Sequence, residues 1–134
     1  HMAKSFNLNI VASDKKFYSG PCQKLIIPAV DGMLEVMAGH ESMVTTIQSG
    51  ELRYEVDGVW HNAAVSDGFV EIMPDYTILL VDTAELPEEI DVKRAQQAKE
   101  RAEERLRQRE SMKEYYYSKA ALARAMARLK VTKK

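Results

Sequence analysis

The sequence of 134 residues has little of what a secreted or membrane-spanning protein needs, beginning with a single cysteine. Cys22 cannot form an internal disulfide, so the sequence predicts a protein of a reducing compartment. No group of Cys and His residues has the spacing of a zinc site, and we expect no metal. The chain also lacks the apolar run of about 18 to 20 residues that crosses a bilayer, and its N-terminus lacks a charged and then apolar signal segment. These absences argue against a disulfide-stapled secreted domain and against a helical membrane span.

Charge is divided unevenly along the chain, although the formal net charge is only -1. Residues 1–87 contain 5 Lys and Arg against 12 Asp and Glu, whereas residues 88–134 contain 14 against 8. A segment of net charge -7 is therefore joined to one of +6. This asymmetry predicts an acidic anchor that carries a basic arm, and it makes the arm the place to look for anionic partners.

Residues 3–86 have the pattern of a small β domain. Phe6, Leu8 and Ile10 alternate with other side chains, which is the period of a strand with one buried face. The same reasoning predicts strands at residues 23–28, 32–36, 43–47, 51–56, 59–65, 69–73 and 76–81. Short strands with no helical pattern between them favour an antiparallel β-sandwich.

Turn residues separate nearly all of these strands. Residues 19–21 (Ser-Gly-Pro) are expected to form one turn. Asp57-Gly58 predicts a two-residue hairpin of type I′, because both positions of that turn need a positive φ, which Asp tolerates and Gly adopts freely.

Residues 87–134 predict two helices that form an antiparallel hairpin. Asp91 is placed to cap the first helix, and Ser111 with Glu114 matches a capping box at the start of the second. The expected apolar stripes are Ala95, Ala98, Ala102 and Leu106 on the first helix and Tyr116, Ala120, Ala123 and Ala127 on the second. Burial is worth about 0.8 kcal/mol per methylene-sized group, so an alanine seam should dock weakly. We therefore expect an arm with two states.

Five segments of the sequence resemble the epsilon subunit of bacterial rotary (F-type) ATP synthases. They are residues 32–40 (GMLEVMAGH), 65–72 (VSDGFVEI), 82–85 (DTAE), 90–95 (IDVKRA) and 124–129 (RAMARL). They follow one another in the family's order and span nearly the whole chain. The first segment departs from the family pattern, with Glu35 where Gly is usual and Ala38 where Pro is usual.

This resemblance implies a non-catalytic subunit of the central stalk, peripheral to the cytoplasmic side of the bacterial cell membrane. The sandwich would bind the gamma subunit and the ring of c subunits, and so couple proton or sodium-ion flow to ATP synthesis. The hairpin would fold onto the sandwich or extend to the subunits of the catalytic head, where it blocks ATP hydrolysis. The residues that match the c-ring contact loop are Asp31, Gly32, Met33, Gly39 and His40. Contact with the membrane would be only indirect, through the complex.

The resemblance also implies ATP as a regulatory ligand that is not hydrolysed, with no cofactor required. The matching residues are Glu85, Ile90, Asp91, Arg94, Ala95, Arg101, Arg124 and Arg128. On a helix, Asp91, Arg94 and Arg101 lie near one face, and converging guanidinium groups suit a triphosphate. The sequence has no P-loop, so hydrolysis is not expected.

Other interpretations of the same residues stay open. Arg101, Arg105 and Arg109 step by four beside acidic side chains, which also describes a solvated helix face. The basic arm could bind nucleic acid, but 8 acidic residues dilute its charge and no stacking-aromatic motif appears. A free ATP sensor without a rotor partner is a third interpretation. A hydrolase is disfavoured, because Ser66 lies in a turn without a nucleophile elbow and His40 has no evident partner for general base catalysis.

Overall fold

The computed structural model describes residues 4–108 and 111–133. Its strands are β1 (Phe6–Ala12), β2 (Lys15–Cys22), β3 (Lys24–Ala29), β4 (Gly32–Val36), β5 (Met43–Ile47), β6 (Gly50–Val56), β7 (Val59–Val65), β8 (Gly68–Ile72), β9 (Tyr76–Val81) and β10 (Ala84–Glu85). A 3-10 helix η1 (Pro87–Glu89) leads to α1 (Val92–Gln108) and α2 (Met112–Thr132). The expected domain limits at residues 3 and 134, and Arg109 of the proposed solvated face, lie outside the described residues.

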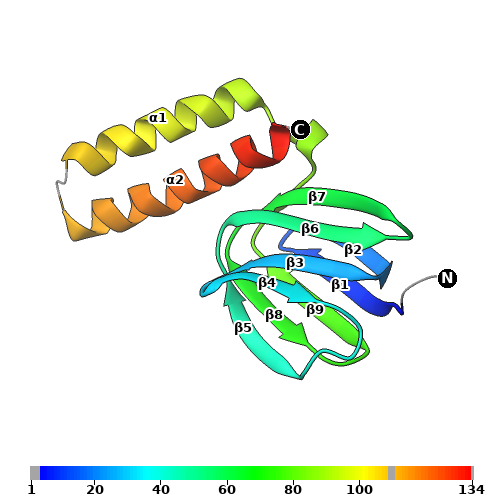
Figure 1. The fold of residues 1–134 in the computed structure, drawn as a ribbon. Coiled ribbons are helices and arrows are strands. Elements are labelled where there is room, and N and C mark those ends of the chain that lie inside the picture. The colour runs from blue at the N-terminus through cyan, green and yellow to red at the C-terminus, as the bar shows by residue number, and fades with distance from the viewer. Residues whose placement is uncertain (1–3, 109–110, 134) are drawn as a thin grey trace.

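The strands form two layers around one apolar core, with the helical hairpin projecting from the side of β6 and β7 (Figure 1). Along the sheet the order is β10-β7-β6-β3-β5-β8-β9-β1-β2, and β4 pairs with β3. The core includes the fully buried side chains of Leu8, Ile10, Leu25, Leu52 and Leu79. The predicted sandwich followed by a two-helix hairpin is thus confirmed. The strand pairing is antiparallel except between β1 and β9, which run parallel.

The hairpin between β6 and β7 has the turn that the sequence predicts. Asp57 has φ 51° and Gly58 has φ 83°, so both central positions are left-handed. A type I′ turn of this kind matches the right-handed twist of the strands on either side. The backbone N-H of Asp57 also donates to the side chain of Gln23 at 2.7 Å, which ties this turn to the residue that immediately precedes β3.

The prediction that residues 19–21 form a turn is wrong, because they lie within β2. Pro21 has no N-H to donate, which is tolerated where a strand has a neighbour on one side only. β2 is such an edge strand, since its only partner in the sheet is β1. Neither β2 nor the short strand β10 was predicted from the sequence.

A side-chain cap is present at both predicted helix starts, but among the described residues only the Ser111 half of the predicted capping box is found. The Asp91 carboxylate accepts a hydrogen bond from the Arg94 backbone N-H at 3.0 Å, and the Ser111 hydroxyl accepts one from the Glu114 N-H at 3.0 Å. Each bond satisfies a backbone donor that the first turn of a helix leaves without a partner. On α1 the predicted stripe is also correct, with Ala95 and Ala102 buried.

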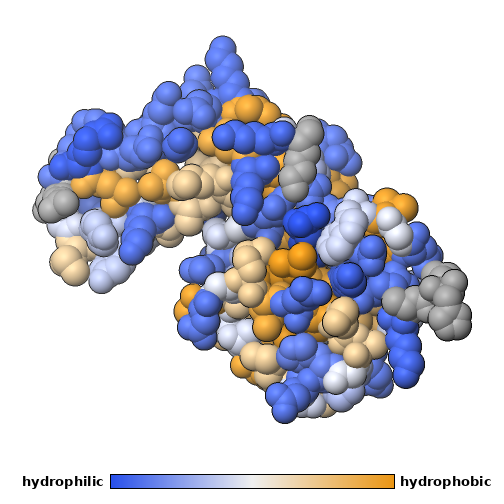
Figure 2. Space-filling view, in the orientation of Figure 1, coloured by the Kyte–Doolittle hydropathy of each residue, from blue (hydrophilic) through white to orange (hydrophobic). Residues whose placement is uncertain are grey.

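The predicted stripe on α2 is partly wrong. Tyr116 is 60% exposed and Ala120 is also exposed, whereas Ala127 is buried as expected. The buried residues of this helix are Ser118, Ala125, Ala127 and Val131. They occupy two faces because α2 packs on two surfaces, α1 along its length and the sandwich near its C-terminal end. Figure 2 shows the resulting apolar strip along the hairpin, beneath the hydrophilic side chains of its outer surface.

Candidate functional site

A cavity of about 390 Å³ lies where the hairpin meets the sandwich. Its lining comes from β10, η1, α1 and α2, and comprises Glu85, Glu89, Ile90, Asp91, Arg94, Ala95, Ala98, Arg101 and Arg128. Seven of the eight residues that the resemblance assigned to ATP therefore line one cavity, although they are up to 43 positions apart in the sequence. Folding of the hairpin onto the sandwich is what brings them together.

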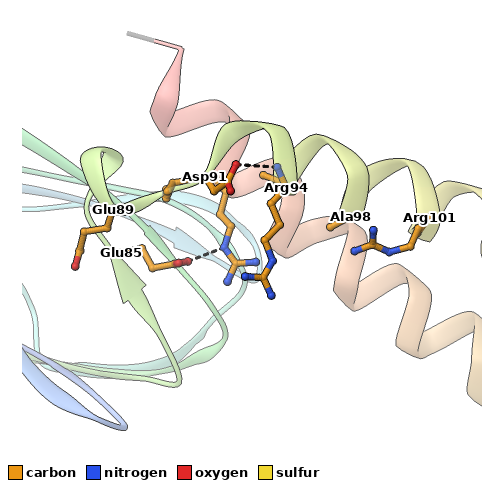
Figure 3. Close-up of a pocket in the computed structure, with 9 residues that line it drawn as sticks. Glu85, Glu89, Asp91, Arg94, Ala98 and Arg101 are labelled. Carbon is orange, nitrogen blue, oxygen red and sulfur yellow. Dashed lines mark hydrogen bonds and ion pairs between the residues drawn. The ribbon is translucent and has the colours of Figure 1, made fainter.

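The helix α1 supplies one wall of this cavity. Asp91 caps the helix at its start, and from there Arg94, Ala98 and Arg101 follow at spacings of three, four and three, which keeps them near one face. Figure 3 shows Arg94 and Arg101 on the same side of the helix, with the small side chain of Ala98 between them. A small residue at this position leaves room between the two guanidinium groups.

The opposite wall is fixed by an ion pair between β10 and α2. Arg128 Nε donates to Glu85 Oε1 at 2.6 Å, and the two side chains are 30% and 31% exposed. The bond uses Nε, so among the described residues the Nη groups of Arg128 keep their donors for a ligand. Glu85 thus orients the Arg128 side chain and occupies only one of its hydrogen-bond donors.

The remaining acidic groups of the cavity are engaged within the protein. Glu89 accepts from the Leu86 backbone N-H at 2.8 Å and lies 3.7 Å from Lys15 Nζ, and Asp91 accepts from the backbone of Arg94. By contrast, within residues 4–108 and 111–133 the guanidinium groups of Arg94 and Arg101 have no hydrogen-bond or ion-pair partner. The cavity therefore holds cationic donors that an anionic ligand can take up.

Arg124 is separated from the other predicted arginines. It lines a neighbouring, smaller space together with Ser66, Thr83, Ala127 and other residues, and the two spaces share Glu85 and Arg128. The ion pair between Glu85 and Arg128 thus stands between Arg124 and the main cavity. The structure brings this predicted residue close to the site without placing it in the same cavity.

Glu89 and Ala98 line the cavity but were not among the predicted site residues. Ala98 was predicted only as part of the apolar stripe of the first helix. The spacing of Ala98, four positions from Arg94 and three from Arg101, is the sequence signal that could have identified it.

The five residues of the predicted c-ring contact loop fall in two places. Asp31, Gly32 and Met33 lie at the turn between β3 and β4, where Met33 is 57% exposed. Gly39 and His40 follow the far end of β4, and the Gly39 N-H bonds to the carbonyl of Pro74 at 2.8 Å. An extended strand separates the two groups, so the five residues do not form one compact loop.

Gly39 has φ 84°, a left-handed conformation that a residue with a side chain rarely adopts. The two departures that the resemblance indicates, Glu35 and Ala38, both precede Gly39 and are accommodated without disturbing this turn. Glu35 is a regular member of β4 that pairs with Ile26, and Ala38 packs against the core.

The structure gives Cys22 the environment of a packed core residue. Its side chain is fully buried, and burial raises the pKa of the thiol from 9.0 to about 11. A thiol that stays protonated is a poor nucleophile. In the described part of the chain, no three His, Cys, Asp or Glu side chains are grouped so that they could hold a metal ion.

Neither α1 nor α2 is long and apolar enough over its described residues to cross a bilayer.

Comparison with known proteins links both parts of the chain to one family. The family described as ATP synthase, Delta/Epsilon chain, beta-sandwich domain matches residues 5–87, and the corresponding long alpha-helix domain matches residues 88–133. The ATP synthase epsilon chain of Ruminiclostridium cellulolyticum is 48% identical over 128 residues, which are 96% of each chain. The epsilon chain of Caldanaerobacter subterraneus subsp. tengcongensis is 43% identical over 134 residues, covering 99% of this chain and 97% of that one.

Solved structures with a similar fold come from mitochondrial ATP synthases. A chain of the Euglena gracilis OSCP/F1/c-ring structure superimposes with a TM-score of 0.83 at 22% identity, over 95% of this chain and 81% of that one. A chain of the Tetrahymena thermophila central stalk/c-ring structure gives 0.63 at 14% identity, over 98% and 99%. At these identities the two structures support the fold alone. The family matches over consecutive parts of the chain and the bacterial relatives over nearly all of it give the assignment: this protein belongs to the ATP synthase delta/epsilon chain family and resembles the bacterial epsilon chains, which are subunits of an enzyme rather than enzymes themselves.

Proposed function

We propose that this protein is a central-stalk subunit whose sandwich joins the gamma subunit to the ring of c subunits, and whose hairpin regulates the enzyme in response to ATP. Membership in the epsilon chain family supports the stalk assignment. The two structural neighbours come from an OSCP/F1/c-ring assembly and a central stalk/c-ring assembly, which supports the same partners. The protein would then be peripheral to the cytoplasmic side of the membrane, and it would couple ion flow through the c ring to ATP synthesis as part of the central stalk.

The observation that carries ATP sensing is the set of guanidinium groups in the cavity. Arg94 and Arg101 have no partner in the described residues, and Arg128 is oriented by Glu85 with its Nη groups available. A triphosphate could accept charge-assisted hydrogen bonds from all three. Because they come from both α1 and α2, the ligand would bind only when the hairpin is folded onto the sandwich.

Such a ligand would stabilise the folded hairpin by mass action. At one hundred times its dissociation constant, the ligand contributes about 2.7 kcal/mol to the state that binds it. The apolar attachment of α2 to the sandwich is small, consisting of Ala64, Ala127 and Val131 with Ile90 beside them. A difference of this size is enough to shift a weakly docked arm. The released arm, with its excess of Lys and Arg, would pair with acidic surfaces of the catalytic head and inhibit hydrolysis.

Calorimetric titration with ATP tests the sensor. Removing one charge-assisted hydrogen bond costs about 1.5 to 3 kcal/mol, so Arg94→Ala and Arg101→Ala should each weaken binding about 10-fold to 150-fold. Arg105→Ala is the matched control, because Arg105 is an exposed arginine of α1 that does not line the cavity. Equal binding by all the variants, or no heat from the unaltered protein at millimolar ATP, would exclude this site.

The regulatory role is tested in the assembled enzyme by pinning the hairpin. Ala64 on β7 and Ala127 on α2 lie in the same apolar cluster, so the pair Ala64→Cys and Ala127→Cys offers a disulfide across the interface. The oxidised enzyme should hydrolyse ATP faster than the reduced one, and each single variant should show no such change. If oxidation leaves the ATPase rate as it was, inhibition does not require the hairpin to leave the sandwich.

A further inference from the structure

The C-terminal turn of α2 has a second attachment to the sandwich, outside the cavity. It is made by Glu51 on β6 and Asn62 on β7, neither of which lines the cavity. Asn62 Nδ2 donates to Glu51 Oε2 at 3.2 Å and to the backbone carbonyl of Val131 at 3.3 Å. Lys130 Nζ lies 3.9 Å from Glu51 Oε1. We call these four residues the polar latch.

Asn62 is placed to donate a hydrogen bond to the C-terminal end of α2. The last carbonyl groups of a helix have no partner within it, and they need a donor from outside. Asn62 provides such a donor from another element of the fold, and Val131, which it reaches, is only 1% exposed. The bond forms only while α2 lies against β7.

Glu51 has an unusual place for a carboxylate. Its neighbour Leu52 points into the core, so Glu51 belongs to the outer face of β6, yet it is only 5% exposed. Since α2 packs against β6 and β7, the helix is what covers this carboxylate. A covered carboxylate needs compensation by donors or by a cation, and Asn62 and Lys130 supply both.

The latch also lies close in sequence to the cavity. Arg128 precedes Val131 by three residues, about one helical turn, so fixing the Val131 carbonyl fixes the rotation and height of α2 at Arg128. Arg128 then meets Glu85, on the opposite side of the same junction.

We propose that Asn62, held by Glu51, is a positioning residue that sets the docked population and the register of α2 without nucleotide, and thereby presents Arg128 to the cavity. The inference rests on the proposed function in one respect only, that the cavity binds ATP. Docking itself is a property of the isolated chain. Glu51, Asn62 and Lys130 stabilise the docked hairpin in the absence of nucleotide, whereas the arginines of the cavity stabilise it when ATP is bound.

Hydrogen exchange of the backbone amides of α2, measured without nucleotide, tests the latch. Asn62→Asp keeps the size of the side chain but replaces the donor by a carboxylate that faces Glu51 and the Val131 carbonyl. Two hydrogen bonds at about 1 kcal/mol each correspond to about a 10-fold to 30-fold shift in docking. The α2 amides of Asn62→Asp should therefore exchange at least about 10-fold faster than those of the unaltered protein, while amides of β8 and β9 keep their rates.

The matched control is Asn9→Ala, which removes an asparagine of β1 that makes no side-chain hydrogen bond within the described residues. It should leave the exchange of α2 unchanged. Should Asn62→Asp also disturb β8 and β9, Asn62→Thr replaces it, because a β-branched residue suits a strand and its short side chain cannot reach Val131. Unchanged exchange of α2 in a variant whose sandwich is intact would overturn the proposal.

A second variant distinguishes the latch from a merely structural role. Adding Glu51→Gln to Asn62→Asp exchanges donor and acceptor between the two strands, so it restores their mutual hydrogen bond and removes the repulsion. Exchange of α2 should then recover in part, because the bond to Val131 stays lost. No recovery at all would mean that Glu51 takes no part in the latch.

Titration of Asn62→Asp with ATP separates this inference from the proposed function. The variant should bind more weakly, by the factor by which the docked fraction of the protein falls, because only the docked state carries the complete cavity. If the unaltered protein does not bind ATP, the exchange result still decides whether the latch exists. If exchange is faster but ATP binding is unaffected, the latch does not position Arg128.

Discussion

Arg128 has the most demanding role of any single residue in the proposed site, because Glu85 and the proposed ATP ligand would both bind its guanidinium group. Its Nε donates to Glu85 and so ties α2 to β10, while its Nη groups have no partner among the described residues and the residue lines the cavity. Lysine carries the same charge, but its single ammonium group cannot serve both directions with a planar set of donors. A substitution of Arg128 by lysine therefore separates the effect of charge on ATP binding from the effect of donor geometry.

For Arg128→Lys we expect ATP affinity to fall by about 10-fold or more, since at least one charge-assisted hydrogen bond is lost. The measurement is calorimetric titration, with hydrogen exchange of α2 in parallel. Arg105→Lys serves as the control, because the side chain of Arg105 is exposed outside the cavity. Unaltered affinity in Arg128→Lys would show that the site needs charge alone.

Cys22 and Tyr54 lead to a prediction about alkaline pH. Burial raises the pKa of the Cys22 thiol from 9.0 to about 11 and that of Tyr54 from 10.0 to about 12. The folded state thus holds both protons more tightly than the unfolded state, so the associated stability is complete below pH 9 and is lost as the pH rises toward 11. Urea unfolding at about pH 8 and about pH 10 should show the lower free energy at the higher pH. Cys22→Ala should reduce this difference, and a difference equal to that of the unaltered protein would assign it to other groups.

At the scale of elements, the sequence correctly predicts a hairpin turn and two helix caps, which depend on a few adjacent residues. It fails for elements whose structure depends on packing against another part of the fold. The turn at Asp57 and Gly58 and the caps at Asp91 and Ser111 follow from the preferences of a few adjacent residues. By contrast, β2 contains Pro21, and its strand character depends on its place at the edge of the sheet. The two buried faces of α2 likewise depend on packing partners that no single helical period encodes.

Ser118 on α2 makes the seam of the hairpin less stable than it could be. Its side chain is 1% exposed, and the hydroxyl has no hydrogen-bond partner in the described residues. Leaving a buried polar group without a partner costs about 1 to 3 kcal/mol. Ser118→Ala should therefore stabilise the hairpin by about 1 kcal/mol and slow exchange of the amides of α1 and α2.

The opposite result is expected for Ser111→Ala. This substitution also removes a serine hydroxyl, but from the N-cap of α2, where the hydroxyl accepts a hydrogen bond from the Glu114 N-H. Loss of an N-cap typically costs about 1 kcal/mol. Comparing the two variants keeps the chemical change constant and varies only the partner. A destabilised Ser118→Ala would mean that the hydroxyl has a partner in solution.

At the scale of the whole molecule, the candidate site is an assembly of residues that the fold brings together from separate parts of the chain. The resemblance implies that Glu85, Arg94 and Arg128 contact ATP, and docking of the hairpin is what places these three residues around one cavity. The spacing within α1 could be read from the sequence. The separation of Arg124 by an ion pair could not, because it depends on how α2 is rotated against the sandwich.

The division of charge gives the last prediction. The acidic sandwich and the basic hairpin attract each other. Among residues 4–108 and 111–133, three ion pairs lie at or beside their junction: Glu85 with Arg128, Glu51 with Lys130, and Lys15 with Glu89. Raising the salt concentration from about 0.1 M to about 1 M shortens the Debye length from about 10 Å to about 3 Å. Exchange of α2 amides should therefore accelerate with salt while the core strands β8 and β9 keep their rates. Sucrose, which favours compact states without screening charge, is the control and should slow exchange. Slower exchange of α2 in high salt would instead assign docking to the apolar cluster of Ala64, Ala127 and Val131, since salt does not weaken contacts of that kind.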